Sequence, residues 1–185
     1  MQRCAWCTKE PLYITYHDEE WGVPVKDPQQ LFEMLILESM QAGLSWLTVL
    51  RKREAMREAF FNFSAEKLAL MTDTDLAQLL NNEKIIRNRL KIKAVQTNAK
   101  SFLHVAAREN ITDYFWQFTR NQVVQNNPRV LADIPSVSPA SITMAKQLKK
   151  DGFAFMGPTT CYALMQATGM VNDHLQSCFR HSQLA

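Results

Sequence analysis

Residues 138–169 are SPASITMAKQLKKDGFAFMGPTTCYALMQATG, a pattern of helix, tight turn and helix. We expect the first helix over residues 138–150 and the second over residues 158–168, where Gly169 stops it. The turn of residues 151–157 places two glycines on either side of apolar side chains. This stretch therefore predicts two helices that pack close together across a short connection.

Two chemistries fit the glycines of this turn. A helix–hairpin–helix uses free backbone N–H groups at a helix N-terminus to bind a phosphate of DNA, and Gly157 is then a DNA contact, with Thr159 and Thr160 as further donors. A phosphate-binding loop of nucleotide hydrolases has similar spacing between Gly152 and Thr159. Pro158 stands where that loop needs its lysine, and a helix instead of a strand precedes the turn, which argues against nucleotide hydrolysis.

Helical signals dominate the rest of the chain, and no alternating run predicts a sheet. Asp27 and Pro28 form a start signal for a helix that runs to about Gln41, and Gly43 breaks it. Further helices are predicted from near Ser45, over 65–70, over 73–81 and over 84–108. Residues 121–135 have the weakest pattern and are expected to be a loop between lobes. The sequence predicts an all-α fold, one two-lobed helical unit over residues 1–185.

Composition sets few limits on function. The 185 residues carry 21 basic and 18 acidic side chains, a net charge of +3, so any DNA-binding face must be local. The N-terminus lacks a signal-peptide pattern, and no apolar run approaches the roughly 20 residues that span a bilayer. We therefore expect a cytoplasmic protein with no membrane contact, whose four cysteines stay reduced and either bind metal or are simply buried.

Four residues near the two ends of the chain are candidate metal ligands. His174 and Cys178 are four apart, so on a helix they would share one face. Cys4 and His17 could complete a tetrahedral set of two cysteines and two histidines. Cys7 is a competing partner because it forms a CxxC pattern with Cys4. Taken singly, each is more often a buried thiol or a surface imidazole.

Aromatic side chains crowd the first fifty positions: Trp6, Tyr13, Tyr16, Trp21, Phe32 and Trp46. Glu38 lies among them, near the end of an otherwise apolar helix. Alone it indicates a solvent-facing glutamate on a core helix. However, a carboxylate, the Gln41 amide, a glycine turn with Leu44 and then Trp46 follow one another closely, which favours a binding pocket.

Five segments share the strongest likeness to a known family: residues 3–6 (RCAW), 11–18 (PLYITYHD), 20–24 (EWGVP), 41–46 (QAGLSW) and 171–174 (VNDH). Together they resemble 3-methyladenine DNA glycosylase I, of the helix–hairpin–helix glycosylase superfamily. The resemblance implies a base-excision-repair enzyme that flips 3-methyladenine out of double-stranded DNA and hydrolyses its N-glycosidic bond.

The resemblance also implies roles for individual residues. Cys4, His17, His174 and Cys178 would hold one structural Zn²⁺, since four protein ligands leave no open position for water; Cys7 would be outside the site. Trp46 would stack on the flipped base, with Tyr13, Tyr16 and Trp6 around it and Glu38 bonding its polar edge. Gly43 and Leu44 would form the wedge that fills the vacated stack, beside Gln41.

The implied chemistry depends on the charge of the lesion. A 3-methyladenine base is cationic while attached to the sugar, so electron-rich rings and one carboxylate favour it over adenine. Asn172 stands where most relatives of the superfamily have a catalytic aspartate, with Asp173 expected to face the metal region. No lysine lies near Thr159, so we predict no strand cleavage. The alternatives are a zinc hydrolase and a non-catalytic module that binds damaged DNA; we expect a monomer.

Overall fold

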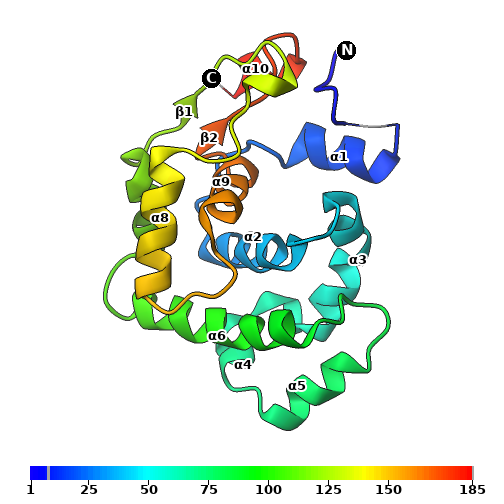
Figure 1. Ribbon diagram of the computed structural model, residues 1–185, viewed down its shortest axis with the longest axis vertical. Coiled ribbons are helices and arrows are strands. Elements are labelled where there is room, and N and C mark those ends of the chain that lie inside the picture. Colours follow the sequence, from blue (N-terminus) through cyan, green and yellow to red (C-terminus); the bar gives the residue numbers. More distant parts are fainter. Residues whose placement is uncertain (8, 185) are drawn as a thin grey trace.

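The structure of the protein is a computed structural model, and it is described for residues 1–7 and 9–184. It is mostly helical, and the helices surround a central one, α2 (Figure 1). The longer helices are α1 (Pro11–Glu19), α2 (Pro28–Gln41), α3 (Trp46–Ala59), α5 (Asp73–Leu80), α6 (Arg89–Ala106), α8 (Pro139–Lys150) and α9 (Pro158–Ala167). The shorter ones are α4 (Ala65–Ala69), α7 (Ile111–Trp116), α10 (Phe179–Gln183) and the 3-10 turns η1 (Phe61–Phe63), η2 (Gln117–Thr119) and η3 (Leu131–Asp133).

Capping side chains fix the starts of the predicted helices. The Asp27 carboxylate accepts from the backbone N–H of Gln30 at 2.9 Å at the start of α2. Ser45, Ser64 and Thr72 do the same for α3, α4 and α5. Each accepts a hydrogen bond from an N–H of the first turn that would otherwise have no partner. The predicted helices over 28–41, from Ser45, over 65–70 and over 73–81 are confirmed to within one residue.

The helix predicted over 84–108 begins later than expected. Asn88 caps α6 by accepting from the N–H groups of Leu90 and Lys91 at 3.0 and 3.1 Å, so residues 84–88 form a turn and an extended segment. Ile85 is buried even though it lies outside the helix. The start was misplaced because burial of Ile85 mimics one position of a helical pattern.

The stretch 121–135, predicted as a loop, contains two short elements, the strand β1 (Val124–Gln125) and the 3-10 turn η3. The strand β1 pairs in parallel with β2 (Val171–Asn172), which lies after α9. Two-residue strands leave no alternation of side chains to detect, so the sequence could not reveal this pairing. The pairing ties the segment before α8 to the segment after α9.

The core is organised around α2. All of residues 31–40 are buried, because α2 packs against α3, α6 and α9 on different sides. The Phe32 and Phe102 rings, for example, pack with centroids 4.8 Å apart between α2 and α6. A polar side chain on such a helix is therefore buried or lines a cavity, which sets the environment of Glu38.

The two ends of the chain meet beside α1 (Figure 1). The backbone N–H of Phe179 donates to the Gln2 carbonyl at 3.0 Å, and the N–H of Leu175 lies 3.3 Å from the Cys4 sulfur. None of the described helices is long and apolar enough to cross a membrane.

Gly169, which ends α9, is a position that only glycine fits. Its φ is +69°, and an added Cβ would lie 2.5 Å from the backbone N of Pro24. We expect Gly169→Ala to lower the free energy of unfolding by about 2–3 kcal/mol, because backbone atoms on the other side must move and a left-handed conformation is strained. Urea unfolding measures this effect. Gly43→Ala is the matched control: its φ is +75° but nothing lies within 4 Å, so only the smaller conformational penalty should appear.

Candidate active site

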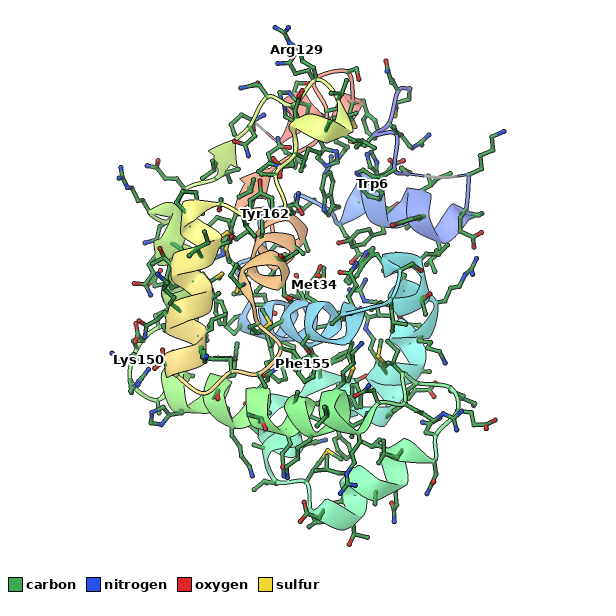
Figure 2. All side chains as sticks on the ribbon, in the orientation of Figure 1. Trp6, Met34, Arg129, Lys150, Phe155 and Tyr162 are labelled. Carbon is green, nitrogen blue, oxygen red and sulfur yellow. The ribbon has the colours of Figure 1, made fainter. Side chains whose placement is uncertain are left out.

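A cavity of about 300 Å³ is lined by residues of α1, α2, α3 and α9 and of the segments next to them. Its lining combines aromatic, polar and apolar side chains: Trp6, Tyr13, Tyr16, Trp21, Glu38, Gln41, Trp46, Leu131, Ile134, Ala163 and Gln166. The labels of Trp6, next to α1, and of Tyr162, on α9, help to find these two helices in Figure 2. The structure thus brings together every base-binding residue predicted from the sequence, and Glu38 with them.

The aromatic rings that line the cavity pack in two groups. Tyr16 and Trp46 pack with centroids 5.3 Å apart, and Trp6 packs on Tyr13 at 5.1 Å and on Trp21 at 4.9 Å. Such tilted and edge-on contacts fix the rings before any ligand binds. The indole Nε1 of Trp46 is buried and has no hydrogen-bond partner among the described residues. A buried N–H without a hydrogen-bond partner costs free energy. Such a group is often found where a bound ligand supplies the missing partner.

Glu38 is 4% exposed, so it is not the solvent-facing glutamate of the simpler interpretation. Burial disfavours its charged form and raises the pKa of its carboxyl to about 8. Burial also raises the pKa of Tyr16, with the nearby Glu38 as the second cause. In the sequence, only the run from Glu38 to Trp46 indicates that Glu38 lies in a pocket. The burial of Glu38 follows from the packing of other helices against three sides of α2.

Several lining residues were not predicted. Neither the sequence pattern nor the resemblance assigns a role to Trp21, and Leu131 and Ile134 lie in the stretch expected to be a loop. Ala163 and Gln166 come from α9, for which the sequence suggested only phosphate binding. No spacing pattern links these residues to Glu38, because they reach the cavity through tertiary packing.

The turn after α2 presents a leucine at the surface beside the cavity. Gly43 has a φ of +75°, and Leu44 is 39% exposed. The leucine that follows the end of α2 is therefore not a buried core residue. Gln41 lines the cavity directly. The buried Lys91 ammonium donates to the carbonyls of Met40 and Ala42 at 2.8 and 2.5 Å, which holds the end of α2 in place.

A side chain of α6 holds the connection between α8 and α9 by hydrogen bonds to its backbone. The Asn98 amide accepts from the Ala154 N–H at 2.7 Å and donates to the Ala154 carbonyl at 3.1 Å. Gly157, at the start of α9, and Thr159 are both exposed. The predicted helix, turn and helix are therefore present, with an open helix N-terminus; the DNA-binding role of Gly157 and Thr159 stays a prediction.

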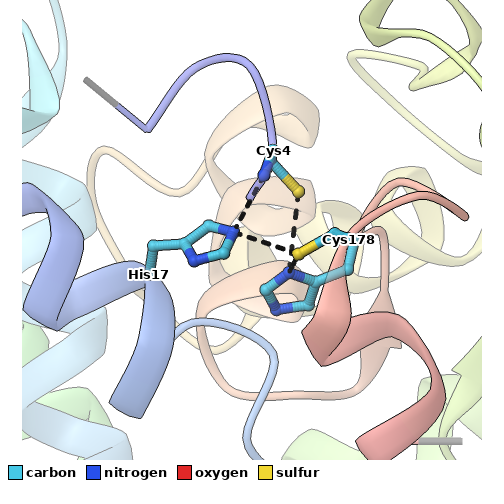
Figure 3. Close-up of side chains that lie close together, drawn as sticks. Cys4, His17 and Cys178 are labelled. Carbon is cyan, nitrogen blue, oxygen red and sulfur yellow. Dashed lines mark hydrogen bonds between the residues drawn. The ribbon is translucent and has the colours of Figure 1, made fainter. Parts of the chain in front are cut away.

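Cys4, His17, His174 and Cys178 form a buried cluster whose ligand atoms all lie within 4.8 Å of one another (Figure 3). The Cys178 sulfur is 3.4 Å from His17 Nε2 and 3.4 Å from His174 Nδ1. Two sulfurs and two imidazole nitrogens are a donor set that suits tetrahedral Zn²⁺. Cys7 is not part of the cluster, and its sulfur lies 3.8 Å from the Tyr13 carbonyl.

Outer contacts orient both imidazoles toward the cluster centre. His17 Nδ1 is 2.7 Å from the Asp18 carboxylate, and His174 Nε2 is 2.9 Å from the Trp21 carbonyl, so the other ring nitrogens can act as ligands. One geometric expectation was wrong: His174 and Cys178 lie in a turn between β2 and α10, not on a helix. A turn brings residues four apart equally close, so the spacing fitted for a different reason.

Asp173 does not face this cluster, contrary to expectation. Its carboxylate accepts from Tyr162 Oη at 2.7 Å, Gln166 Nε2 at 2.8 Å and Asn126 Nδ2 at 2.7 Å. Asn172 takes the opposite direction and donates to the His181 carbonyl at 3.0 Å. Asp173 directly follows β2, and successive side chains on an extended backbone point to opposite sides, so Asn172 and Asp173 face in opposite directions.

Comparison with known proteins agrees with this architecture. The family model described as methyladenine glycosylase matches residues 6–181. DNA-3-methyladenine glycosylase 1 of Escherichia coli is 46% identical over 179 residues, which cover 96% of each chain.

The chain belongs to the methyladenine glycosylase family.

The family's members hydrolyse N-glycosyl bonds, so the cavity is a candidate for the site of that reaction. A crystal structure of 3-methyladenine DNA glycosylase I matches with a TM-score of 0.94 and 49% identity, over 96% of this chain and 98% of that one. A tyrosine-to-phenylalanine variant of a similar enzyme, solved in complex with 3-methyladenine, matches with a TM-score of 0.93 and 36% identity over 97% of both chains.

Proposed function

We propose that this methyladenine glycosylase releases 3-methyladenine from double-stranded DNA by holding the flipped base in the cavity lined by Glu38 and Trp46. The observation that carries the proposal is a buried carboxyl group inside an aromatic cavity of about 300 Å³. A purine ring fits between such walls, and the solved complex of a relative with 3-methyladenine supports the choice of base.

The charge of the lesion explains how this cavity selects it. The attached 3-methyladenine is cationic, so it gains from cation–π contact with Trp46 and from the carboxylate of Glu38. Neutral adenine gains neither. A bound cation also lowers the pKa of Glu38 from its raised value, because an opposite charge favours the ionised form.

We further propose that the leaving group itself supplies most of the reactivity. The cationic base departs as a neutral molecule, so less stabilisation of the sugar is needed. Asn172 and Asp173 are both held by internal hydrogen bonds and do not line the cavity, and Glu38 is the only carboxylate among the described lining residues. No lysine lines the cavity among the described residues, which agrees with monofunctional hydrolysis to a free base and an abasic site.

The DNA contacts follow from two exposed features beside the cavity. Leu44 protrudes from a turn held by Lys91, which suits a wedge that replaces the flipped nucleotide. The open N-terminus of α9 at Gly157, with Thr159, suits a backbone phosphate. We also propose that Cys4, His17, His174 and Cys178 bind one structural Zn²⁺, supported by their geometry. A cytoplasmic, monomeric enzyme stays our expectation.

The direct test incubates purified protein with methylated duplex DNA and separates the released bases by chromatography. We expect free 3-methyladenine and intact strands that break only when alkali cleaves the abasic sites. Binding of the damaged duplex without base release would instead favour a non-catalytic module, and strand breaks without alkali would contradict monofunctional hydrolysis.

Leu44→Ala separates DNA distortion from base recognition. We expect KM for a duplex substrate to rise about tenfold, since the cost of unstacking a base step is no longer offset. Binding of free 3-methyladenine, followed by tryptophan fluorescence, should not change. Leu70→Ala is the control, because Leu70 is 82% exposed and lies at the end of α4, which contributes no residue to the cavity. Equal KM for Leu44→Ala and wild type would reject the wedge.

A further inference from the structure

We propose that Gln166 determines specificity in the cavity by accepting a hydrogen bond from the exocyclic amino group of the base, and that Asp173 is the positioning residue that turns the Gln166 oxygen toward it. This inference rests on the proposed function, that the cavity takes 3-methyladenine. Both residues lie outside the set of base-binding residues that the sequence implies.

The orientation of the Gln166 amide follows from its partner. Gln166 Nε2 donates to Asp173 Oδ2 at 2.8 Å, and a carboxylate can only accept. The nitrogen of Gln166 must therefore face Asp173, and its oxygen must face away. Gln166 lines the cavity, and no described residue donates to its Oε1. That oxygen is also not among the fully buried atoms that lack a partner, so it remains accessible to a ligand.

Asp173 is itself fixed. It is 1% exposed and accepts two more hydrogen bonds, from Tyr162 Oη at 2.7 Å and from Asn126 Nδ2 at 2.7 Å. Donors from α9 and from the segment after β1 thus hold both carboxylate oxygens. Rotation of Asp173 would break these bonds, so Gln166 keeps one orientation before the base enters.

A fixed acceptor has a clear chemical consequence. The amino group of 3-methyladenine has two N–H donors, and Glu38 and Gln166 are acceptors on α2 and α9, two helices that pack against each other. A base with an oxygen at this position, such as 3-methylhypoxanthine, would place a lone pair against the Gln166 oxygen. A site built to pair with an amino group rejects the analogue that lacks it, because its polar groups are left unpaired.

The test compares the binding of free 3-methyladenine and 3-methylhypoxanthine by tryptophan fluorescence. Gln166→Met keeps the side-chain length but removes the acceptor. We expect it to weaken 3-methyladenine binding about tenfold, the value of one good hydrogen bond, while 3-methylhypoxanthine binding is unchanged or improves. A loss of affinity for both bases by the same factor, or for neither, would overturn the proposal.

Thr168→Val is the matched control, because it removes a buried hydrogen bond at the end of α9, from Thr168 Oγ1 to the Leu164 carbonyl at 2.6 Å, without touching Asp173 or the Gln166 amide. We expect a lower Tm but 3-methyladenine affinity within about twofold of wild type. If Thr168→Val narrows the preference between the two bases as much as Gln166→Met does, general loosening of α9 explains the effect and the role of Gln166 is wrong.

The positioning role of Asp173 is tested by exchanging the two groups. Gln166→Glu alone sets two carboxylates in contact, so we expect weaker binding of 3-methyladenine. Adding Asp173→Asn supplies an amide that donates to the carboxylate now at position 166, whose other oxygen then faces the cavity. We expect the double variant to recover affinity to within about threefold of wild type. No recovery in a folded double variant would reject positioning by Asp173, and a wild-type protein that binds neither base would instead defeat the proposed function.

Discussion

Glu38→Gln is expected to lower kcat/KM for release of 3-methyladenine about 10²-fold and, at the same time, to stabilise the protein. The activity falls because glutamine cannot provide a charge for the cationic base, and a charge-assisted hydrogen bond in a buried site is worth roughly 2–3 kcal/mol. Release of bases from methylated DNA under single-turnover conditions measures the loss.

The stability gain depends on pH, and its sign follows from burial. Folding raises the pKa of Glu38 from its ordinary value of 4.5 to about 8, so the folded state holds the proton more tightly than the unfolded state. Stability from this group is therefore complete below about pH 4.5 and is lost as the pH rises through 8. Glutamine does not titrate, so the variant should gain nothing from this effect at about pH 4.5 and roughly 2–4 kcal/mol at about pH 9.

Glu33→Gln is the matched control on the same helix. Glu33 is also buried, but its carboxylate pairs with Arg53 at 2.7 Å and Arg57 at 2.8 Å and does not line the cavity. Breaking that network should lower Tm and leave base release nearly unchanged. A Glu38→Gln enzyme of normal activity would reject the role of the carboxylate, and one with lower stability at about pH 9 would reject its unpaired burial.

Sequence reasoning succeeds for the elements whose signals are local. Asp27 and Ser45 predict helix starts because each capping bond joins residues close in the chain. Apolar spacing, in contrast, places the start of α6 too early, because the buried Ile85 continues the apolar pattern to the N-terminal side of Asn88. An apolar side chain buried by tertiary packing cannot be told from a helical core position by its spacing alone.

The candidate site was predictable only in part for the same reason. The run from Glu38 to Trp46 lies on consecutive elements, so the sequence indicates a pocket there. Gln166 and Ile134 reach the cavity from segments far along the chain, and no local pattern connects them with Glu38. The choice of Cys4 over Cys7 likewise came from resemblance, since both cysteines precede α1 and spacing cannot decide which one faces the cluster.

Cys178→Ser is expected to abolish stoichiometric zinc and to lower the free energy of unfolding by about 4–6 kcal/mol. Zinc sites in small peptides contribute ~10–16 kcal/mol, and the effect is smaller here because a large core folds around α2. Elemental analysis of the purified protein and thermal unfolding with and without a chelator measure both quantities. Cys161→Ser is the control, because Cys161 is buried outside the cluster and should lose only local packing. A wild-type protein that is fully stable without metal would contradict the assignment.

Activity of the same variant distinguishes a structural metal from a catalytic one. The cluster and the cavity share a wall: Trp21 packs on His174 with centroids 4.5 Å apart, and its carbonyl is 2.9 Å from His174 Nε2. Loss of the metal should loosen Trp21 and lower base release by less than about tenfold at temperatures well below Tm. Because four protein ligands would leave no position for water or substrate, we expect that a bound metal would have no step of the reaction to perform. Complete loss of base release in a still-folded Cys178→Ser protein, restored by zinc, would show that this reasoning is wrong.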